Sequence, residues 1–380
     1  MYEYFTNIRI RKFVLIRKFV GSLMKSNTKI KVVGVGGAGG NAVSRMMKCH
    51  LEGVDFIALN TDDQDLRKCR ANMKLQIGKK VTRGLGAGMN PELGRLSAEE
   101  NTEQIKEILK DSDMIFVTCG LGGGTGTGAA PIVAKIAKDT GALTIAIVTK
   151  PFAFEGIPRM EIASRGLLDL HDKVDAMLVI PNDKLLNLVD KKTTLLNAFW
   201  ICDDVLRQAV QGISDLILLP GIINVDFADV KAIMESAGSC MMGVGRAKGE
   251  GRAIEAARRA INSPLLDFSI EGARGLLFNV SGKEDMSLGE INEAAKVITE
   301  KISPEAKIIF GAVEDQRLRK GEIKVTVIAT GFNQMKSPKN LKIFETPKIL
   351  SKPEQRIEVQ VVETLEEKEW EVPAFLRKKK

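Results

Sequence analysis

Two glycine-rich segments constrain this chain more than any other feature of its sequence. GVGGAGGNA (34–42) and GGGTGTG (122–128) each follow a short apolar run and precede a segment of helical composition. Glycine tolerates positive φ and lets the backbone approach a bound group closely, and a helix N-terminus presents N–H groups to an anion. Two such junctions predict a phosphate site built from backbone amides at one edge of a sheet.

Apolar runs alternate with helical segments from residue 29 to residue 182. Buried strands separated by helical crossovers predict an α/β fold, with a parallel sheet and helices on both faces. Phosphate ligands of such sheets bind at the carboxyl ends of the strands. The expected strands are 29–35, 54–60, 113–120, 143–151 and 174–182, and the expected helices are 41–50, 97–110 and 129–138.

The second half of the chain predicts a long helix and then a smaller, strand-rich domain. Apolar residues near helical spacing mark the helix at 184–219. The smaller domain has expected strands at 275–282, 307–315 and 323–331 and an expected helix at 288–302. Beyond it, prolines and lysines without periodicity are typical of a flexible linker.

The charge is concentrated at the ends of the chain. The net charge is +8, and residues 1–31 hold eight basic residues against Glu3, so the remaining residues are close to neutral. We therefore expect no nucleic-acid partner. The two histidines and five cysteines form no C-x-x-C pair, which excludes a zinc ribbon and a disulfide framework, and no apolar run is long enough for a transmembrane helix.

Residues 1–28 have no clear place in a packed domain. Three interpretations remain open: a dispensable or misassigned leader with Met24 as the start, an amphipathic segment on a membrane surface, or an organelle-targeting peptide. The second is supported by an apolar stripe that a helix would form from Phe13, Ile16, Val20 and Leu23.

The first glycine segment alone permits a dinucleotide site. Gly34, Gly36 and Gly39 satisfy G-x-G-x-x-G, and Asp55 lies near the position of a ribose-binding acid. The other interpretation of this segment is a tight turn without a ligand. The second segment lacks the lysine of a P-loop, so phosphate binding there depends on backbone amides, a helix dipole and a metal ion, with hydroxyl groups from Thr125 and Thr127.

Several motifs together resemble the tubulin/FtsZ family of GTPases over about residues 29–331. GGGTGTG is similar to the family signature, and GVGGAGGNA to its first nucleotide loop. NTD (60–62) and RGLGAGMNPE (83–92) resemble the loops beside the phosphates, and PFAFEG (151–156) and PNDKLL (181–186) resemble the sugar segment and the approach to a central helix. The resemblance implies that GTP or GDP is bound by Gly36, Gly37, Ala38, Gly39, Gly40, Asn41, Gly88, Gly123, Gly124, Thr125, Gly126, Thr127, Gly128, Glu155, Arg159, Asn182 and Asp203.

The resemblance also implies a tubulin-like division of the chain. We expect a disordered basic leader, a GTP-binding domain with a parallel sheet, a long central helix, a smaller α+β C-terminal domain that activates hydrolysis, a flexible linker and a partner-binding peptide. Their bounds are 1–28, 29–192, 193–220, 221–331, 332–369 and 370–380.

Asp203, in CDDVLRQAVQG (202–212), falls where the family has its guanine-reading acid or amide. A carboxylate accepts hydrogen bonds from both N1–H and the 2-amino group of guanine, which adenine cannot offer. Asp204 stands beside it, so the sequence leaves open which of the two faces the base. Trp200 is an unusual residue for that face of the helix.

GIINVDFADV (221–230) resembles the family's synergy loop, which enters the GTP site of the neighbouring subunit. The resemblance implies that Asn224, Asp226 and Asp229 orient the attacking water and coordinate cations there. The alternative is that Asp226 only caps a helix beginning at Phe227.

The tail WEVPAFLRKKK (370–380) resembles the family's C-terminal peptide. It implies docking on membrane-tethering division proteins such as FtsA, SepF or ZipA, with apolar residues in a groove and basic residues on acids or anionic lipid.

The function implied is GTP-dependent, head-to-tail polymerisation into the filaments of a cytoplasmic Z ring at midcell. No protein metal site is expected, and Mg²⁺ would be held by phosphates and water. Two alternatives stay open: a Rossmann-type NAD-dependent enzyme and a structural polymer that does not hydrolyse GTP.

Overall fold

The computed structural model describes residues 28–49, 51, 53–186, 194–219, 221–263, 272–303 and 305–332, all within one folded unit, Met1–Gln334. The predicted leader, linker and tail peptide lie outside the described residues, apart from Thr28 and Phe332.

The first half of the chain forms the predicted parallel sheet. Its strands lie in the order β3 (Met73–Gln76), β2 (Val54–Asn60), β1 (Ile30–Val35), β4 (Met114–Gly120), β5 (Leu143–Lys150) and β6 (Ala176–Pro181). All five pairings are parallel. The α/β fold class and the predicted strands are confirmed. Strand β3 was not predicted, because MKLQ is a short, largely polar segment at the sheet edge without an apolar run.

The two glycine-rich segments meet where the strand order reverses. β1 and β4 are neighbours in register, with Val35 opposite Cys119, although the chain between them first builds β2 and β3. Each glycine-rich segment continues directly from the carboxyl end of one of these strands. Open α/β sheets bind ligands at such a switch point, so this topology places both segments around one site.

Helices α2 (Gly36–Lys48) and α7 (Gly124–Asp139) begin inside the glycine-rich segments. The predicted starts at residues 41 and 129 are therefore wrong by five residues. Glycine is a poor helix former, but here its small size permits close packing. A Cβ on Gly39 would lie 2.5 Å from the carbonyl oxygen of Thr118, and a Cβ on Gly128 would lie 1.8 Å from that of Pro91.

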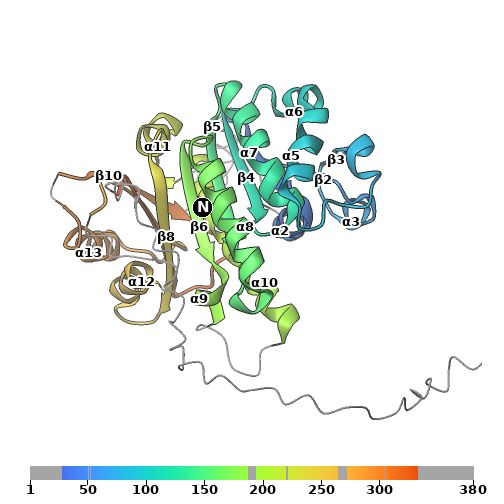
Figure 1. Ribbon diagram of the computed structural model, residues 1–380. Coiled ribbons are helices and arrows are strands. Elements are labelled where there is room, and N and C mark those ends of the chain that lie inside the picture. Colours follow the sequence, from blue (N-terminus) through green and yellow to red (C-terminus); the bar gives the residue numbers. More distant parts are fainter. Residues whose placement is uncertain are drawn as a thin grey trace, which may run out of the picture. The chain divides into compact units, whose positions relative to one another are not determined.

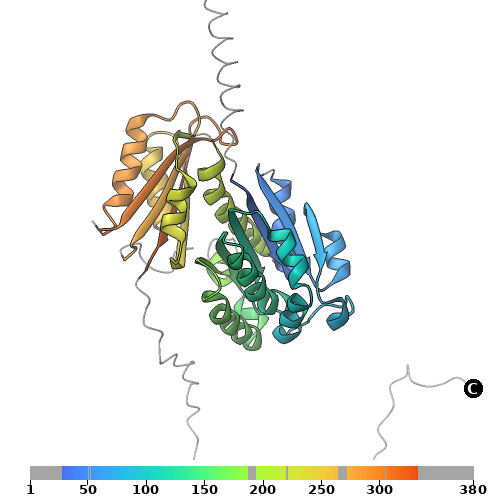
Figure 2. The same ribbon diagram turned by 90° about the horizontal axis from the view of Figure 1, so that it is seen from above.

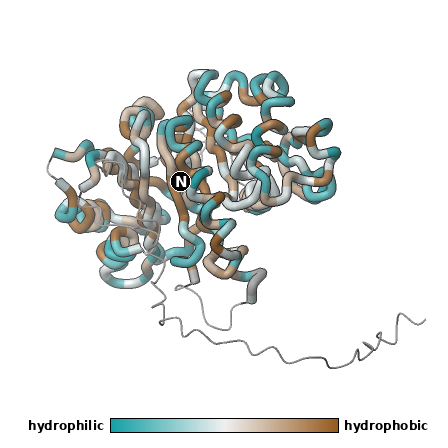
Figure 3. Tube along the Cα trace, viewed as in Figure 1, coloured by the Kyte–Doolittle hydropathy of each residue, from teal (hydrophilic) through white to brown (hydrophobic). Residues whose placement is uncertain are grey.

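Helices cover both faces of the parallel sheet (Figure 1). Alternate strand residues face opposite sides: Val32 and Phe116 pack in one core with α2 and α10 (Leu195–Leu218), and Val33 and Val117 pack in the other with α7. The remaining helices are α3 (Asp63–Lys68), α4 (Lys79–Thr82), α5 (Pro91–Glu100), α6 (Thr102–Leu109), α8 (Ile157–His171) and α9 (Asn182–Leu186). Figure 3 shows hydrophobic stretches along the central strands, with hydrophobic and hydrophilic residues alternating along the helices.

The single helix predicted at 97–110 is two helices, α5 and α6, which meet at Asn101. Asn101 holds a non-helical backbone conformation between them. Its side chain accepts a hydrogen bond from the N–H of Gly78, so the break is fixed by a contact that is distant in sequence.

The C-terminal half adds a mixed sheet, in the order β8, β11, β9, β10 and β7. Helices α12 and α13 contribute to a separate core with these strands, and Figure 2 shows α10 between the two groups of strands. The bounds are β7 (Gly221–Ile223), α11 (Phe227–Met234), β8 (Gly238–Lys248), α12 (Arg252–Ile261), β9 (Gly275–Gly282), α13 (Leu288–Thr299), β10 (Lys307–Glu314) and β11 (Glu322–Thr330). Strand β8 was not predicted, because GSCMMGVGRAK mixes glycine and basic residues among its apolar ones.

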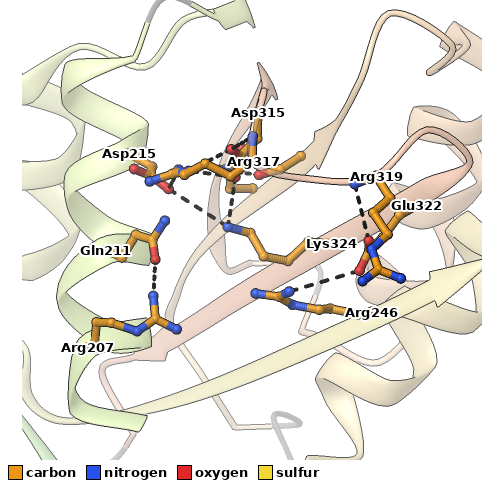
Figure 4. Close-up of polar contacts among 11 residues, drawn as sticks. Arg207, Gln211, Asp215, Arg246, Asp315, Arg317, Arg319, Glu322 and Lys324 are labelled. Carbon is orange, nitrogen blue, oxygen red and sulfur yellow. Dashed lines mark hydrogen bonds and ion pairs between the residues drawn. The ribbon is translucent and has the colours of Figure 1, made fainter. Parts of the chain in front are cut away.

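An ionic cluster joins the central helix α10 to the C-terminal sheet (Figure 4); its Asp215, Asp315 and Lys324 are buried and its Arg317 is exposed. Arg317 donates to Asp215 on α10 at 2.6 Å and to Asp315 at 2.7 Å. Lys324 on β11 lies 3.4 Å from Asp315 and 3.8 Å from Asp215. Burial raises the pKa of Asp215 and lowers that of Lys324, and the opposite charges partly offset both shifts. The cluster therefore ties α10 to β11 through groups that depend on one another for their charge.

Candidate functional site

A cavity of about 310 Å³ opens at the carboxyl ends of β1, β4 and β5. It is lined by backbone of both glycine-rich segments and by side chains from α10 and from the segment that begins at Pro151. The predicted GTP-binding residues that line it are Gly36, Gly37, Ala38, Gly88, Gly123, Gly124, Thr125, Gly126, Glu155, Arg159, Asn182 and Asp203.

A second cavity, of about 510 Å³, adjoins the first and shares Gly37, Gly88 and Thr125 with it. Its other lining residues are mostly polar: Asn60, Asp62, Gln64, Asp65, Lys68, Leu85, Gly86 and Ala87. The Thr125 hydroxyl lies 2.6 Å from that of Thr61, so the NTD segment and the second glycine-rich segment are joined directly.

The glycines of the second segment serve two different purposes. Gly123 has an extended backbone and a Cβ there would meet nothing within 4 Å, so this position faces open space in the cavity. A Cβ on Gly126 would instead lie 2.6 Å from the carbonyl oxygen of Gly120. Gly126 is therefore required by the approach of α7 to β4, whereas Gly123 leaves room for a ligand.

Five of the predicted GTP-binding residues do not line the cavity: Gly39, Gly40, Asn41, Thr127 and Gly128. The three from the first segment lie further along α2, and Asn41 is exposed. The buried Thr127 hydroxyl accepts a hydrogen bond from the N–H of Gly122 at 2.9 Å, so it holds the loop in shape.

One wall of the cavity carries an ion pair and a buried amide. Glu155 and Arg159 form a salt bridge one helical turn apart, and Glu155 also accepts from the N–H of Phe152. Asn182, at the start of α9, is buried, and its Oδ1 makes no hydrogen bond within the described part of the chain. A buried acceptor is costly to leave unsatisfied, so Asn182 is suited to a donor group of a ligand.

Another part of the lining comes from α10, where Asp203 lines the cavity and Asp204 does not. Asp204 accepts from Arg207 and Gln208 at 2.7 Å each, both on its own helix. Burial raises the pKa of Asp203 to about 6, and the neighbouring Arg45 limits that rise. The arrangement leaves Asp203 as the carboxylate available to a bound base.

One aromatic side chain of α10, Phe199, also lines the cavity, and it was not among the predicted site residues. Its ring packs edge-on against Phe152, with ring centroids 5.4 Å apart. Trp200 lies beside it on α10 and stacks on Arg45 instead. A signal for Phe199 was present in its spacing, since it precedes Asp203 by one helical turn and shares its face.

Asn224, Asp226 and Asp229 are exposed and do not line the cavity. In Figure 1, α11 lies at the end of the strands opposite to α9. Helix α11 begins at Phe227 as predicted, but the Asp226 side chain makes no capping hydrogen bond. Asn224 accepts from the N–H of Gly221 at 2.6 Å. Capping therefore does not account for the carboxylate of Asp226.

The dinucleotide interpretation is not favoured by the position of Asp55. This residue is exposed near the amino end of β2, opposite Lys31 of β1, and thus lies at the wrong edge of the sheet. Among the described residues, no group of three or more His, Cys, Asp or Glu side chains is arranged to hold a metal ion. None of the described helices combines the length and apolar character needed to cross a bilayer.

Comparison with known proteins gives matches over both halves of the fold. A family model described as the GTPase domain of the Tubulin/FtsZ family matches residues 29–190, and one described as the C-terminal domain of the FtsZ family matches residues 238–333. The chain is 47% identical to an FtsZ from M. jannaschii solved as an empty dimer, with a TM-score of 0.79 over 83% of this chain and 92% of that one.

A more distant match has the same fold. CetZ2 from Haloferax volcanii, solved as a GTPgS-bound protofilament, is 23% identical, with a TM-score of 0.69 over 81% of this chain and 94% of that one. At this identity the likeness concerns the fold alone. The family resemblance noted in the sequence is confirmed by the matches to both domains.

Proposed function

This chain belongs to the tubulin/FtsZ family of GTPases, with an FtsZ-family C-terminal domain, and on that premise we propose that it polymerises head to tail and hydrolyses GTP at the subunit junctions. The filaments would form the cytokinetic ring of a dividing cell. Assembly would stimulate hydrolysis, because each complete site needs two subunits.

One observation carries this proposal: the two sets of predicted active-site residues lie at opposite ends of the same sheet. The cavity is at the carboxyl ends of β1, β4 and β5, whereas helix α11 lies at the other end, with Asp226 exposed just before it and Asp229 exposed in its first turn. A head-to-tail contact would bring the second set onto the first. Such contacts do not close, so they generate open filaments. The M. jannaschii relative is described as a dimer and CetZ2 as a protofilament.

The phosphates of GTP would bind where α2 and α7 begin. The first residues of both helices line the cavity, and the helix dipoles favour negative charge there. The open space at Gly123 leaves room for phosphate oxygens. The Thr125 hydroxyl would add a donor.

The base and the sugar would bind along the walls of the same cavity. Asp203 would accept from N1–H and the 2-amino group of guanine, with Phe199 as an apolar surface beside the ring. Glu155 and Arg159 would contact the sugar. Asn182 has a buried acceptor without a partner among the described residues, which suits a donor of the bound nucleoside.

A magnesium ion fits this site as a partner of the phosphates. The described residues offer no cluster of three protein ligands for a metal ion. Asp62 and Asp65 line the adjoining cavity, where their carboxylates would bind water molecules of a hydrated Mg²⁺ ion. Bound Mg²⁺ would neutralise charge on the β- and γ-phosphates. The protein side chains would orient the nucleotide, and Asp226 and Asp229 of the neighbouring subunit would orient the attacking water.

The flanking segments would connect the filament to a membrane. We retain the predicted bounds of the domains, with the peptide 370–380 docking on a tether such as FtsA, SepF or ZipA. Its Phe375 and Leu376 are apolar anchors and its last residues are basic. Recruitment by this peptide would place the filaments at the midcell division ring.

The direct test is sedimentation and phosphate release by the purified protein with GTP. Asp229→Ala should bind GDP with normal affinity, pellet with GTP and lose turnover, because it acts only on the neighbour's nucleotide. Glu235→Ala, which removes an exposed carboxylate at the other end of α11, is the matched control. Normal turnover in Asp229→Ala would refute the split site, and no GTP-dependent pelleting of wild type would refute the filament.

A further inference from the structure

Arg45 reaches from α2 across to α10 and contacts Asp203. Its Nε donates to Oδ2 of Asp203 at 3.1 Å, and its Nη2 lies 3.0 Å from the same oxygen. Both contacts end on Oδ2, so Oδ1 stays free of Arg45 and is available to a ligand in the cavity. Arg45 does not itself line the cavity.

Trp200 holds the other side of this guanidinium. The Cζ of Arg45 lies 5.4 Å from the centroid of the Trp200 ring, within the range of a cation–π interaction. Trp200 is 52% exposed, which is high for a tryptophan, and the Arg45 guanidinium lies over its ring. The indole therefore restricts the rotamers of Arg45 and keeps its charge over α10.

The charge of Asp203 depends on this contact. Burial opposes ionisation and raises its pKa to about 6, while Arg45 is the opposing influence. The other titratable groups of this region supply no positive charge to Asp203. Burial raises the pKa of Cys202 to about 12, so its thiol stays neutral, and Glu155 is an acid that is already paired with Arg159.

We propose that Arg45, held in place by Trp200, is a positioning residue that keeps Asp203 ionised and oriented toward the purine edge, and thereby sets the preference for guanine. The inference rests on the proposed function, in which Asp203 reads the base. A guanidinium suits the task better than an ammonium, because its planar fork stacks on the indole while it donates to the carboxylate.

The inference predicts a pH dependence that a purely structural ion pair would lack. A carboxylate must be ionised to accept both guanine hydrogen bonds, so removing Arg45 should weaken GDP binding most at low pH. The quantity to compare is the Kd of Arg45→Gln for GDP divided by that of wild type. We expect this ratio to be about tenfold larger at pH 6 than at pH 8.5. Taking the ratio to wild type cancels the protonation of the nucleotide's own phosphate, which also titrates near pH 6.

Three further variants sharpen the test. Trp200→Leu should raise the Kd for GDP at pH 6 in the same way but by a smaller factor, since it keeps Arg45 and removes only the indole ring that Arg45 packs against. Arg45→Lys should lie between wild type and Arg45→Gln at pH 6, because it keeps the charge. Arg207→Gln is the matched control, since it breaks the neighbouring ion pair with Asp204, which does not line the cavity. Its Kd ratio should not change with pH.

Base preference separates the inference from the function on which it rests. IDP lacks the 2-amino group, so Arg45→Gln should also narrow the GDP-over-IDP preference. If Asp203→Asn keeps normal GDP affinity and preference, the assignment of the base to Asp203 is wrong. If Asp203→Asn loses them while Arg45→Gln matches wild type at both pH values, the assignment stands and the role of Arg45 is refuted.

Discussion

Replacing Asp203 by asparagine should stabilise the nucleotide-free protein while abolishing its response to GDP. The ordinary pKa of an aspartate is 3.8, and burial raises that of Asp203 to about 6. Between these values the folded state holds a proton that the unfolded chain has released. Stability therefore falls as pH rises through this window, and the loss is complete above about pH 6.

The size of the effect follows from the shift in pKa. A difference of about two units corresponds to roughly 3 kcal/mol of unfolding free energy at neutral pH. Asparagine has nearly the same shape and does not ionise, so Asp203→Asn should gain up to about 3 kcal/mol at pH 7.5 and roughly half of that at pH 5. The burial of this carboxylate is thus a cost to folding that nucleotide binding requires.

The assay is denaturant unfolding of nucleotide-free protein at the two pH values, with and without saturating GDP. GDP at a hundred times its Kd should stabilise wild type by about 2.7 kcal/mol and the variant hardly at all. Asp204→Asn is the control and should show neither effect, since Asp204 does not line the cavity. An Asp203→Asn protein that is no more stable than wild type at pH 7.5, or whose gain is independent of pH, would refute the reasoning.

Three further predictions follow from the structure. Gly123→Val should fold normally and abolish GDP binding measured by calorimetry, because its side chain enters the open phosphate space, whereas Gly126→Val should lower the melting temperature because it meets backbone. Asp215→Ala should lower the unfolding free energy by about 3 kcal/mol in denaturant titration, since it deprives the buried Lys324 of a partner; unchanged stability would contradict the role of the ionic cluster. Deleting residues 370–380 should leave GTP turnover unchanged and abolish tether-dependent flotation with liposomes; a loss of turnover would contradict a purely recruiting role.

Most strands of the parallel sheet could be predicted because they are largely apolar runs buried on both faces, and only the polar edge strand β3 was missed. Strands such as Val54–Asn60 and Leu143–Lys150 need no tertiary information to be recognised. The starts of α2 and α7 could not be predicted, because glycine disfavours helix locally and only close packing against distant backbone offsets that preference. Strand β8 was missed for a similar reason, since it is defined by its pairing with β11.

The residues of the candidate site could be predicted where they belong to sequence motifs. They could not be predicted where their role depends on contacts between distant parts of the chain. The sequence could not separate Asp203 from Asp204, because adjacent positions on a helix differ only in which neighbours they meet. Nor could it indicate that Thr127 holds the loop, or that Arg45 contacts Asp203 from 158 positions earlier in the chain. Such pairings arise only when α2 and α10 pack together.

The central claim, that one GTP site is completed by two subunits, is tested most directly by mixing two inactive variants. Asp229→Ala should bind GTP but lack the residue for its neighbour's site, and Gly123→Val should hold no GTP but keep Asp229. Phosphate release should be near background for each variant alone and should recover in the mixture. It would occur at junctions between one subunit of each kind, where the Asp229→Ala subunit holds GTP and the Gly123→Val subunit contributes its intact Asp229. A mixture that stays at background while co-pelleting with GTP, or an Asp229→Ala protein that is active alone, would contradict the account.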